Sequence, residues 1–144
     1  MKEKHKSAYM KCAIAFSECS NAQRLKVGSV IVKDNKIISC GYNAMPEHIN
    51  DPCETTDGNT DHRVRHSEKN ALMGLIRSSQ SAVGATMFCN YSCCLNCAID
   101  IVDSGIIEFI YMNDYRDDSG LEYLKNNGVR VEKWQEKELV SIRK

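Results

Sequence analysis

Short segments with the composition of β-strands alternate with helical segments along this chain, and this alternation restricts its fold more than any other feature. Two strand segments flank the turn pair Asp34-Asn35, which predicts a β-hairpin. Each later strand is separated from the next by a helix, an order that favours right-handed βαβ crossovers. The predicted helices are 7–19, 66–79, 94–104 and 119–127, and the predicted strands are 27–33, 36–42, 85–91, 106–112 and 129–133. We therefore expect a single α/β domain over residues 1–144, a layered fold with a five-stranded mixed sheet flanked by helices.

Charge and cysteine content exclude several classes of protein. Lys and Arg together number 19, as do Asp and Glu, so the net charge is zero and a basic surface for long nucleic acids or membranes is not expected. The chain has no stretch of the length and apolarity of a membrane span, and its first residues do not resemble a secretory signal. The eight cysteines are therefore expected to stay reduced in the cytoplasm, as metal ligands, nucleophiles or core residues.

Two short motifs carry recognisable chemistry: His66-Ser67-Glu68 and Cys94-Leu95-Asn96-Cys97. Each lies at the predicted start of a helix. Cysteines at positions i and i+3 of a first helical turn project from one face, and a helix N-terminus lowers the pKa of a thiol. One imidazole and two thiolates fill three of the four positions of tetrahedral zinc, as in catalytic zinc sites.

Glu68 suits the role of general base and then general acid beside water activated by zinc. The combination H-x-E with C-x-x-C is a recorded signature of zinc nucleobase deaminases. Two other interpretations are a redox C-x-x-C pair and half of a structural zinc ribbon. The first lacks its thioredoxin-type context, and the second lacks another C-x-x-C. Cys93 precedes the motif where a proline is usual, and we expect it to be a neighbouring thiol rather than a ligand.

These motifs, together with Gly41-Tyr42-Asn43-Ala44-Met45-Pro46 and Val27-Gly28-Ser29-Val30-Ile31-Val32, resemble the cytidine and deoxycytidylate deaminase family. The resemblance covers most of residues 8–133. The stretch that begins at Gly41 is most particular to the deoxycytidylate branch. The resemblance implies a zinc-dependent hydrolase that converts dCMP to dUMP and ammonia and supplies thymidylate synthesis. Glu68 would protonate N3 of the base and then the leaving amino group.

The resemblance also implies a set of residues that bind the substrate. Asn43 would contact the sugar or phosphate region, and the backbone at Ser67 would contact the base. Two basic residues before the first strand are the phosphate candidates. The expected substrate-binding residues are Asn43, Ser67, Ser92, Tyr115, Lys26 and Arg24.

Many family members hold a second, structural zinc, and the matching positions here are Cys19, Cys53 and His62. Such a metal would order the long polar loop over residues 43–65. His48, Asp57 and Asp61 are the candidates for its fourth ligand.

Family members are commonly homohexamers that dCTP activates and dTTP inhibits, and Arg77 matches a basic position associated with that regulation. Two alternatives stay open from the sequence. One is deamination of another base, as in cytidine, dCTP or tRNA adenosine. The other is a non-catalytic binding module stabilised by zinc, which would have no need of Glu68.

Overall fold

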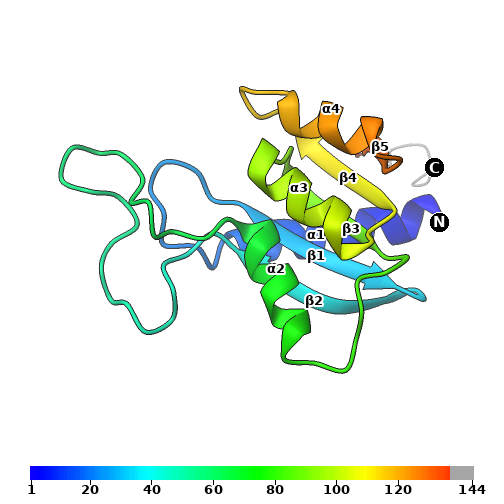
Figure 1. Cartoon of the computed structure of the whole chain (residues 1–144), viewed down its shortest axis with the longest axis horizontal. Helices are drawn as coiled ribbons and strands as arrows, with labels where there is room; N and C mark the ends of the chain where they lie inside the picture. Colours follow the sequence, from blue (N-terminus) through cyan, green and yellow to red (C-terminus); the bar gives the residue numbers. More distant parts are fainter. Residues whose placement is uncertain (137–144) are drawn as a thin grey trace, which may run out of the picture.

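A five-stranded mixed sheet in the order β2-β1-β3-β4-β5 forms the centre of the computed structural model, which describes residues 1–136 (Figure 1). Strand β1 is antiparallel to both β2 and β3, whereas β3, β4 and β5 are parallel to one another. The strands are β1 (Gly28–Lys33), β2 (Lys36–Tyr42), β3 (Thr86–Tyr91), β4 (Glu108–Asn113) and β5 (Arg130–Lys133). The mixed sheet, the hairpin and the parallel crossovers are confirmed.

The hairpin turn follows directly from its two residues. Asp34 and Asn35 have φ values of 52° and 61°, the left-handed conformation that a two-residue turn between right-twisted strands requires. Asp and Asn tolerate this region better than most residues. The turn therefore brings β2 back along β1, with an irregularity in register between Ile31 and Val32.

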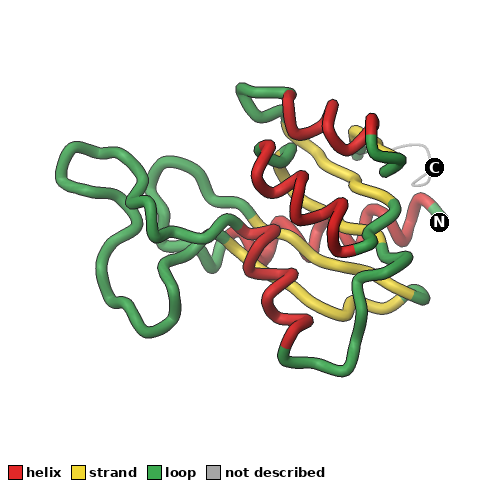
Figure 2. Tube along the Cα trace, in the orientation of Figure 1, coloured by secondary structure: helices red, strands yellow, loops and turns green. Residues whose placement is uncertain are grey.

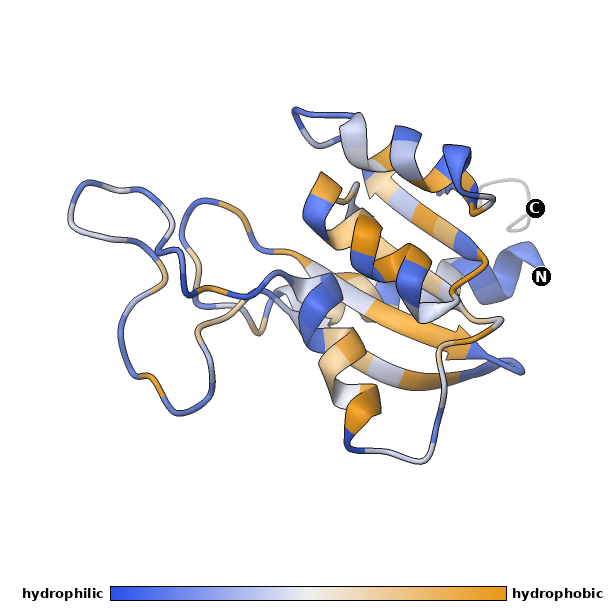
Figure 3. Cartoon of the chain, viewed as in Figure 1, coloured by the Kyte–Doolittle hydropathy of each residue, from blue (hydrophilic) through white to orange (hydrophobic). Residues whose placement is uncertain are grey.

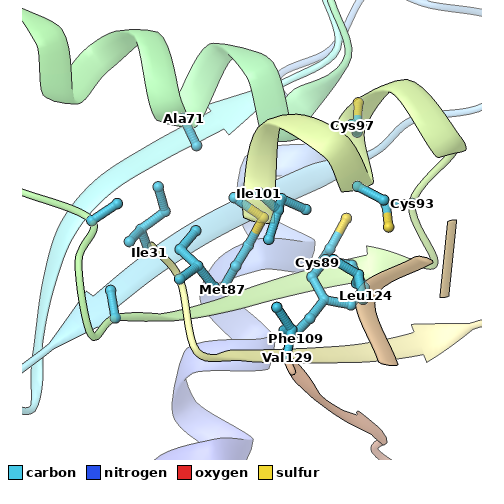
Figure 4. Packing of buried hydrophobic residues seen from close by; sticks show 14 of the residues in the cluster. Ile31, Ala71, Met87, Cys89, Cys93, Cys97, Ile101, Phe109, Leu124 and Val129 are labelled. Atoms are coloured by element: carbon cyan, nitrogen blue, oxygen red, sulfur yellow. The ribbon is translucent and has the colours of Figure 1, made fainter. Parts of the chain in front are cut away.

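Helices cover both faces of the sheet. The helices are α1 (Glu3–Ser17), α2 (Ser67–Ile76), α3 (Leu95–Ser104) and α4 (Ser119–Asn126). Helix α1 packs on one face, where Val30, Phe88 and Ile110 meet Met10. Helices α2, α3 and α4 lie over the opposite face, above alternate strand residues such as Ile31, Met87, Cys89 and Phe109 (Figure 4). This alternation along each strand buries the sheet on both sides.

Residues 43–65 form a long excursion without a regular helix or strand beyond isolated bridges at 44↔65 and 54↔60. Figure 2 shows this loop projecting past the end of the sheet, and Figure 3 shows that it is mostly hydrophilic. Arg63 stabilises it through hydrogen bonds to Asp61 (2.9 and 3.0 Å) and to Asp51 (2.8 Å). The loop leaves the sheet at the end where α2 begins.

Element boundaries differ from the prediction mainly in the first two helices. Helix α1 begins at Glu3, because its polar first turn is stabilised by Lys6, which binds Glu132 at 2.8 Å. Helix α2 ends at Ile76 and not at residue 79. Residues 134–136 follow β5 without a helix, and residues 137–144 lie outside the described part. No helix within residues 1–136 has the length and apolarity needed to span a membrane.

Candidate active site

Three metal-ligating side chains meet at the N-termini of two helices. His66 immediately precedes α2, Cys94 immediately precedes α3, and Cys97 lies in the first turn of α3. His66 Nδ1 is 3.4 Å from Cys94 Sγ and 3.4 Å from Cys97 Sγ. Since β3 leads into α3 and the long loop leads into α2, the fold brings together ligands far apart in the sequence.

The three donors fit a zinc ion. For a tetrahedral ion with the usual Zn–N and Zn–S bond lengths, a nitrogen and a sulfur ligand are about 3.5 Å apart, close to the distances observed. The Cys94 thiol is also primed to ionise, whereas its hydrogen bond with Cys97 and burial raise the pKa of the Cys97 thiol. The hydrogen bond from Cys97, aided by His66, holds the pKa of the Cys94 thiol well below its usual range, at about 4. Three ligands leave the fourth position of such an ion for water or substrate.

Glu68 lies in the first turn of α2, two residues after His66, and is 3% exposed. Ser67 Oγ donates a hydrogen bond of 2.6 Å to its Oε1. Burial raises the pKa of the Glu68 carboxyl above its ordinary value, and the bond from Ser67 opposes that rise. A carboxyl group with a raised pKa is suited to both accept and release a proton near neutral pH.

A cavity of about 570 Å³ opens onto these groups, and its lining includes His66, Glu68 and Cys94. The rest of its lining comes mostly from loops, among them Arg24, Glu54, Thr60, Tyr115 and Arg116. Glu54 Oε2 accepts hydrogen bonds from the backbone N–H groups of Gln23 (3.0 Å) and Arg24 (3.3 Å). The long loop and the segment before β1 are thereby held together at the cavity.

Asn43 lies in the cavity lining and holds the segment before β1 in place. Its Oδ1 accepts from the backbone N–H of Val27 at 2.9 Å, and its Nδ2 donates to the carbonyl of Leu25 at 2.8 Å. Asn90 binds the two residues that alternate with these. It accepts from the N–H of Gly28 and donates to the carbonyl of Lys26. Two asparagine side chains therefore hold the backbone of residues 25–28, of which Leu25 and Val27 line the cavity.

The other predicted substrate-binding residues divide into two groups. Ser67, Ser92, Tyr115 and Arg24 line the cavity, and the backbone N–H of Tyr115 donates to Ser92 Oγ at 2.7 Å. Lys26 is exposed and does not belong to the lining. Arg116, which sequence reasoning missed, does line it, with its guanidinium 5.6 Å from the centre of the Tyr115 ring. Its position directly after Tyr115 was the available signal.

The predicted second zinc site stays a prediction, because its three candidate ligands do not lie together in the described residues as the first three do. Among residues 1–136, the one group of three or more His, Cys, Asp or Glu donors within 4.8 Å of one another is His66, Cys94 and Cys97. Cys19 and Cys53 both line a second cavity, but the His62 side chain is 95% exposed and lies 3.8 Å from Asp61. The loop also has polar contacts of its own, from Arg63 to Asp51 and Asp61.

The candidates for a fourth ligand of that site have other partners or lie on the surface. Asp61 binds Arg63, and Asp57 accepts hydrogen bonds from Thr55 and Asn59. His48 is exposed. The loop carboxylates therefore contribute hydrogen bonds that help to order the loop.

Cys93 is fully buried, and burial raises the pKa of its thiol. It packs in the core cluster beneath α3 (Figure 4). Gly120 of α4 lies against the backbone here, since a Cβ at that position would be 2.2 Å from the carbonyl oxygen of Cys93. Helix α4 therefore packs directly against the segment that carries Cys94.

A layered α/β fold with one histidine and two cysteines at helix N-termini, and a buried glutamate beside them, defines the class of zinc-dependent base deaminases. Residues 3–113 match the model of the cytidine and deoxycytidylate deaminase zinc-binding region. The chain belongs to the cytidine and deoxycytidylate deaminase family.

Individual relatives agree with this assignment. The chain is 34% identical to the deoxycytidylate deaminase of Saccharomyces cerevisiae over 137 residues, which cover 87% of this chain and 43% of the yeast protein. It is 33% identical to the human deoxycytidylate deaminase over 119 residues, 77% of this chain and 66% of that protein. It thus spans less than half of the yeast relative and about two thirds of the human one. The crystal structure of dCMP deaminase from the cyanophage S-TIM5 in complex with dCMP and dUMP is similar, with a TM-score of 0.91, 41% identity, and coverage of 93% of this chain and 99% of that one.

Proposed function

We propose that this chain hydrolyses dCMP to dUMP and ammonia, as one deaminase domain over residues 1–144, and so supplies dUMP for thymidylate synthesis. The observation that carries the proposal is the cluster of His66, Cys94 and Cys97 at a cavity that His66, Cys94 and the buried Glu68 line. The similarity to the cyanophage dCMP deaminase along 99% of that enzyme's length supports the choice of substrate.

His66, Cys94 and Cys97 would hold the zinc ion, which when bound supplies Lewis-acid activation of water for hydrolysis. Glu68 takes a proton from the attacking water and delivers it to N3 of cytosine. It then takes a second proton, from the hydroxyl now on C4, and delivers it to the amino group that leaves C4. Since Ser67 occupies Oε1, we assign these transfers to Oε2. Asn43 and Asn90 keep the wall of the cavity fixed while the base is bound.

Arg24 and Arg116 are the proposed phosphate-binding residues, because both line the cavity and guanidinium groups match phosphate oxygens well. Lys26 is left out of this assignment because its side chain is not part of the lining. Ser92 and Tyr115 are proposed to contact the nucleotide from the opposite loop, which their mutual hydrogen bond holds against β3.

Assembly into a homohexamer and regulation by dCTP and dTTP also belong to the proposal. Met73 (43% exposed) and Ile76 (74% exposed) leave apolar surface on the outer face of α2, next to Arg77 at the end of that helix. A second copy of the chain covering this face would remove that surface from water. All eight cysteines are free thiols, which supports a cytoplasmic location.

The test is ammonia release from purified, zinc-loaded protein with dCMP, with cytidine, deoxycytidine and dCTP in parallel assays. The parent chain should act on dCMP. E68Q should retain its zinc and lose at least about 100-fold in turnover, because a general acid–base group contributes about 10²–10⁴-fold. A zinc-stabilised binding module would be indifferent to this substitution. Normal deamination by E68Q would overturn the mechanism, and preference for another substrate would redirect the assignment to another base or nucleotide.

A further inference from the structure

Two buried hydroxyl groups lie behind the Glu68 carboxylate. Ser67, in the first turn of α2, and Ser29, in β1, are both 0% exposed. Their Oγ atoms are 2.7 Å apart, and Ser67 Oγ is 2.6 Å from Glu68 Oε1. Cys89 of β3 borders the pair, with its Sγ 3.8 Å from Ser67 Oγ. A polar chain therefore runs from the middle of the sheet to the carboxylate at the cavity.

The direction of these hydrogen bonds follows from counting protons. An ionised carboxylate only accepts, so Ser67 must donate its one hydroxyl proton to Glu68 Oε1. Ser67 then has only acceptor capacity left toward Ser29, and Ser29 must be the donor in that contact. The order Ser29 to Ser67 to Glu68 is thus the arrangement in which each bond has one donor and one acceptor.

Burying hydroxyl groups among apolar side chains costs free energy unless each hydroxyl has a hydrogen-bond partner. The side chains around this polar chain belong to the main apolar cluster, including Ile31, Ala71 and Met87. A buried hydroxyl without a partner costs about 1–3 kcal/mol, whereas alanine at either site would cost nothing of this kind. Both hydroxyls have partners within the chain, Ser29 with Ser67 and Ser67 with Glu68.

We propose that Ser67, oriented by Ser29, is a positioning residue that fixes the Glu68 carboxylate through Oε1 and so presents Oε2 to the reacting atoms. This inference rests on the proposed function and adds to it the group that orients the general acid–base residue. The proton of Ser67 stays on Ser67 throughout. In the transfers already described, one O–H bond of water breaks as a bond forms at Oε2, and that proton passes to N3. The O–H bond of the hydroxyl now on C4 then breaks as a second proton passes through Oε2 to the leaving amino group, so that C4 keeps the oxygen as a carbonyl.

The test is a double-mutant cycle between Ser67 and Glu68. S67A should lower kcat for dCMP by about 10- to 100-fold, as expected for misplacement of a catalytic group, and leave KM within about twofold. S29A should produce a smaller loss, since Ser67 keeps its own bond to Oε1. In the E68Q background, S67A should change kcat by less than about twofold, because Ser67 acts only through the carboxylate.

Two controls separate positioning from general packing. S39A removes another serine hydroxyl that binds α2, at the carbonyl oxygen of Ala71 (2.6 Å), and should leave kcat within about twofold. S67A should also match the parent in zinc content and in its dissociation constant for dUMP. A kcat for S67A within about twofold of the parent, or an equal loss in the E68Q background, would overturn the proposal.

A structural measurement keeps this proposal separate from the proposed function. Crystal structures of the parent and S67A should show one carboxylate orientation in the parent and a rotated or split carboxylate in S67A. An unchanged carboxylate would overturn the positioning role. Failure of the parent chain to deaminate dCMP would instead overturn the proposed function, and the crystallographic comparison would still decide whether Ser67 fixes Glu68.

Discussion

Two arginines reach the cavity from loops far apart in the sequence, Arg24 before β1 and Arg116 after β4. Each arginine is held in place by a neighbouring residue. The N–H of Arg24 is bound by Glu54, and the guanidinium of Arg116 lies over the Tyr115 ring. Two arginines on one cavity in a chain of zero net charge are consistent with the phosphate-binding role proposed for them.

The corresponding prediction compares ligands with and without a phosphate. R116A should weaken dUMP binding by about 10- to 100-fold, the cost of losing a hydrogen bond to a charged group, and leave deoxyuridine binding within about twofold. Titration calorimetry measures both constants. K26A, which changes an exposed neighbour of the cavity, is the matched control and should bind dUMP normally. Equal weakening for both ligands would show that Arg116 supports Tyr115 and does not bind phosphate.

At the scale of elements, the site depends on how closely α2 approaches β2. A Cβ on Gly41 would lie 2.5 Å from the carbonyl oxygen of Ser67 and 2.5 Å from the backbone nitrogen of Ala71. Both are backbone atoms of α2, so no side-chain rotation could relieve the contact. The absence of a side chain at Gly41 therefore sets the position of the helix turn that carries Ser67 and Glu68.

G41A should destabilise the protein by about 3 kcal/mol, the upper end of the range for overpacking, and lower kcat by displacing Glu68. Urea unfolding and the dCMP assay measure the two effects. G74A is the control on the same interface, because its Cβ would meet only the Ser39 Oγ, a side-chain atom that can rotate. G74A should cost less than about 1 kcal/mol. A stable, fully active G41A would show that α2 can shift without loss.

The sequence predicted the elements better than the contacts between them. Strand periodicity and the pair Asp34-Asn35 are local signals, so the strands and the hairpin could be predicted from short stretches of sequence. The metal-ligating trio was predictable because helix starts constrain where its side chains point. The second zinc rests on resemblance alone and stays a prediction, and the Arg63 contacts that help to order the loop are visible only in the folded chain. The place of Arg116 in the cavity lining was not predicted for the same reason, because the position of a loop depends on the whole fold.

At the scale of the whole molecule, the metal ligands connect two helices that otherwise belong to different crossovers. His66 belongs to the start of α2 and both cysteines to the start of α3. An ion bound by all three would therefore resist separation of these helices during unfolding. Ligand binding to the folded state alone stabilises it by mass action.

Removal of zinc by a chelator should lower the Tm of the parent by about 5–10 °C, the shift expected for loss of a ligand present well above its dissociation constant. Differential scanning calorimetry with and without chelator measures it. C94S should already have the lower Tm and should not respond to the chelator. C19S, which alters a cysteine outside the trio, should retain the full response. Identical chelator responses of C94S and the parent would contradict a zinc bound at this trio.

The cavity has two kinds of wall, and this division has an evolutionary consequence. The reacting groups stand on helix starts packed against the sheet, whereas Arg24, Glu54, Thr60, Tyr115 and Arg116 come from connecting loops. Loops accept insertions and substitutions far more readily than packed elements. Proteins with this fold can therefore change the molecule they recognise through substitutions in the loops, while the reacting groups on the packed elements stay the same.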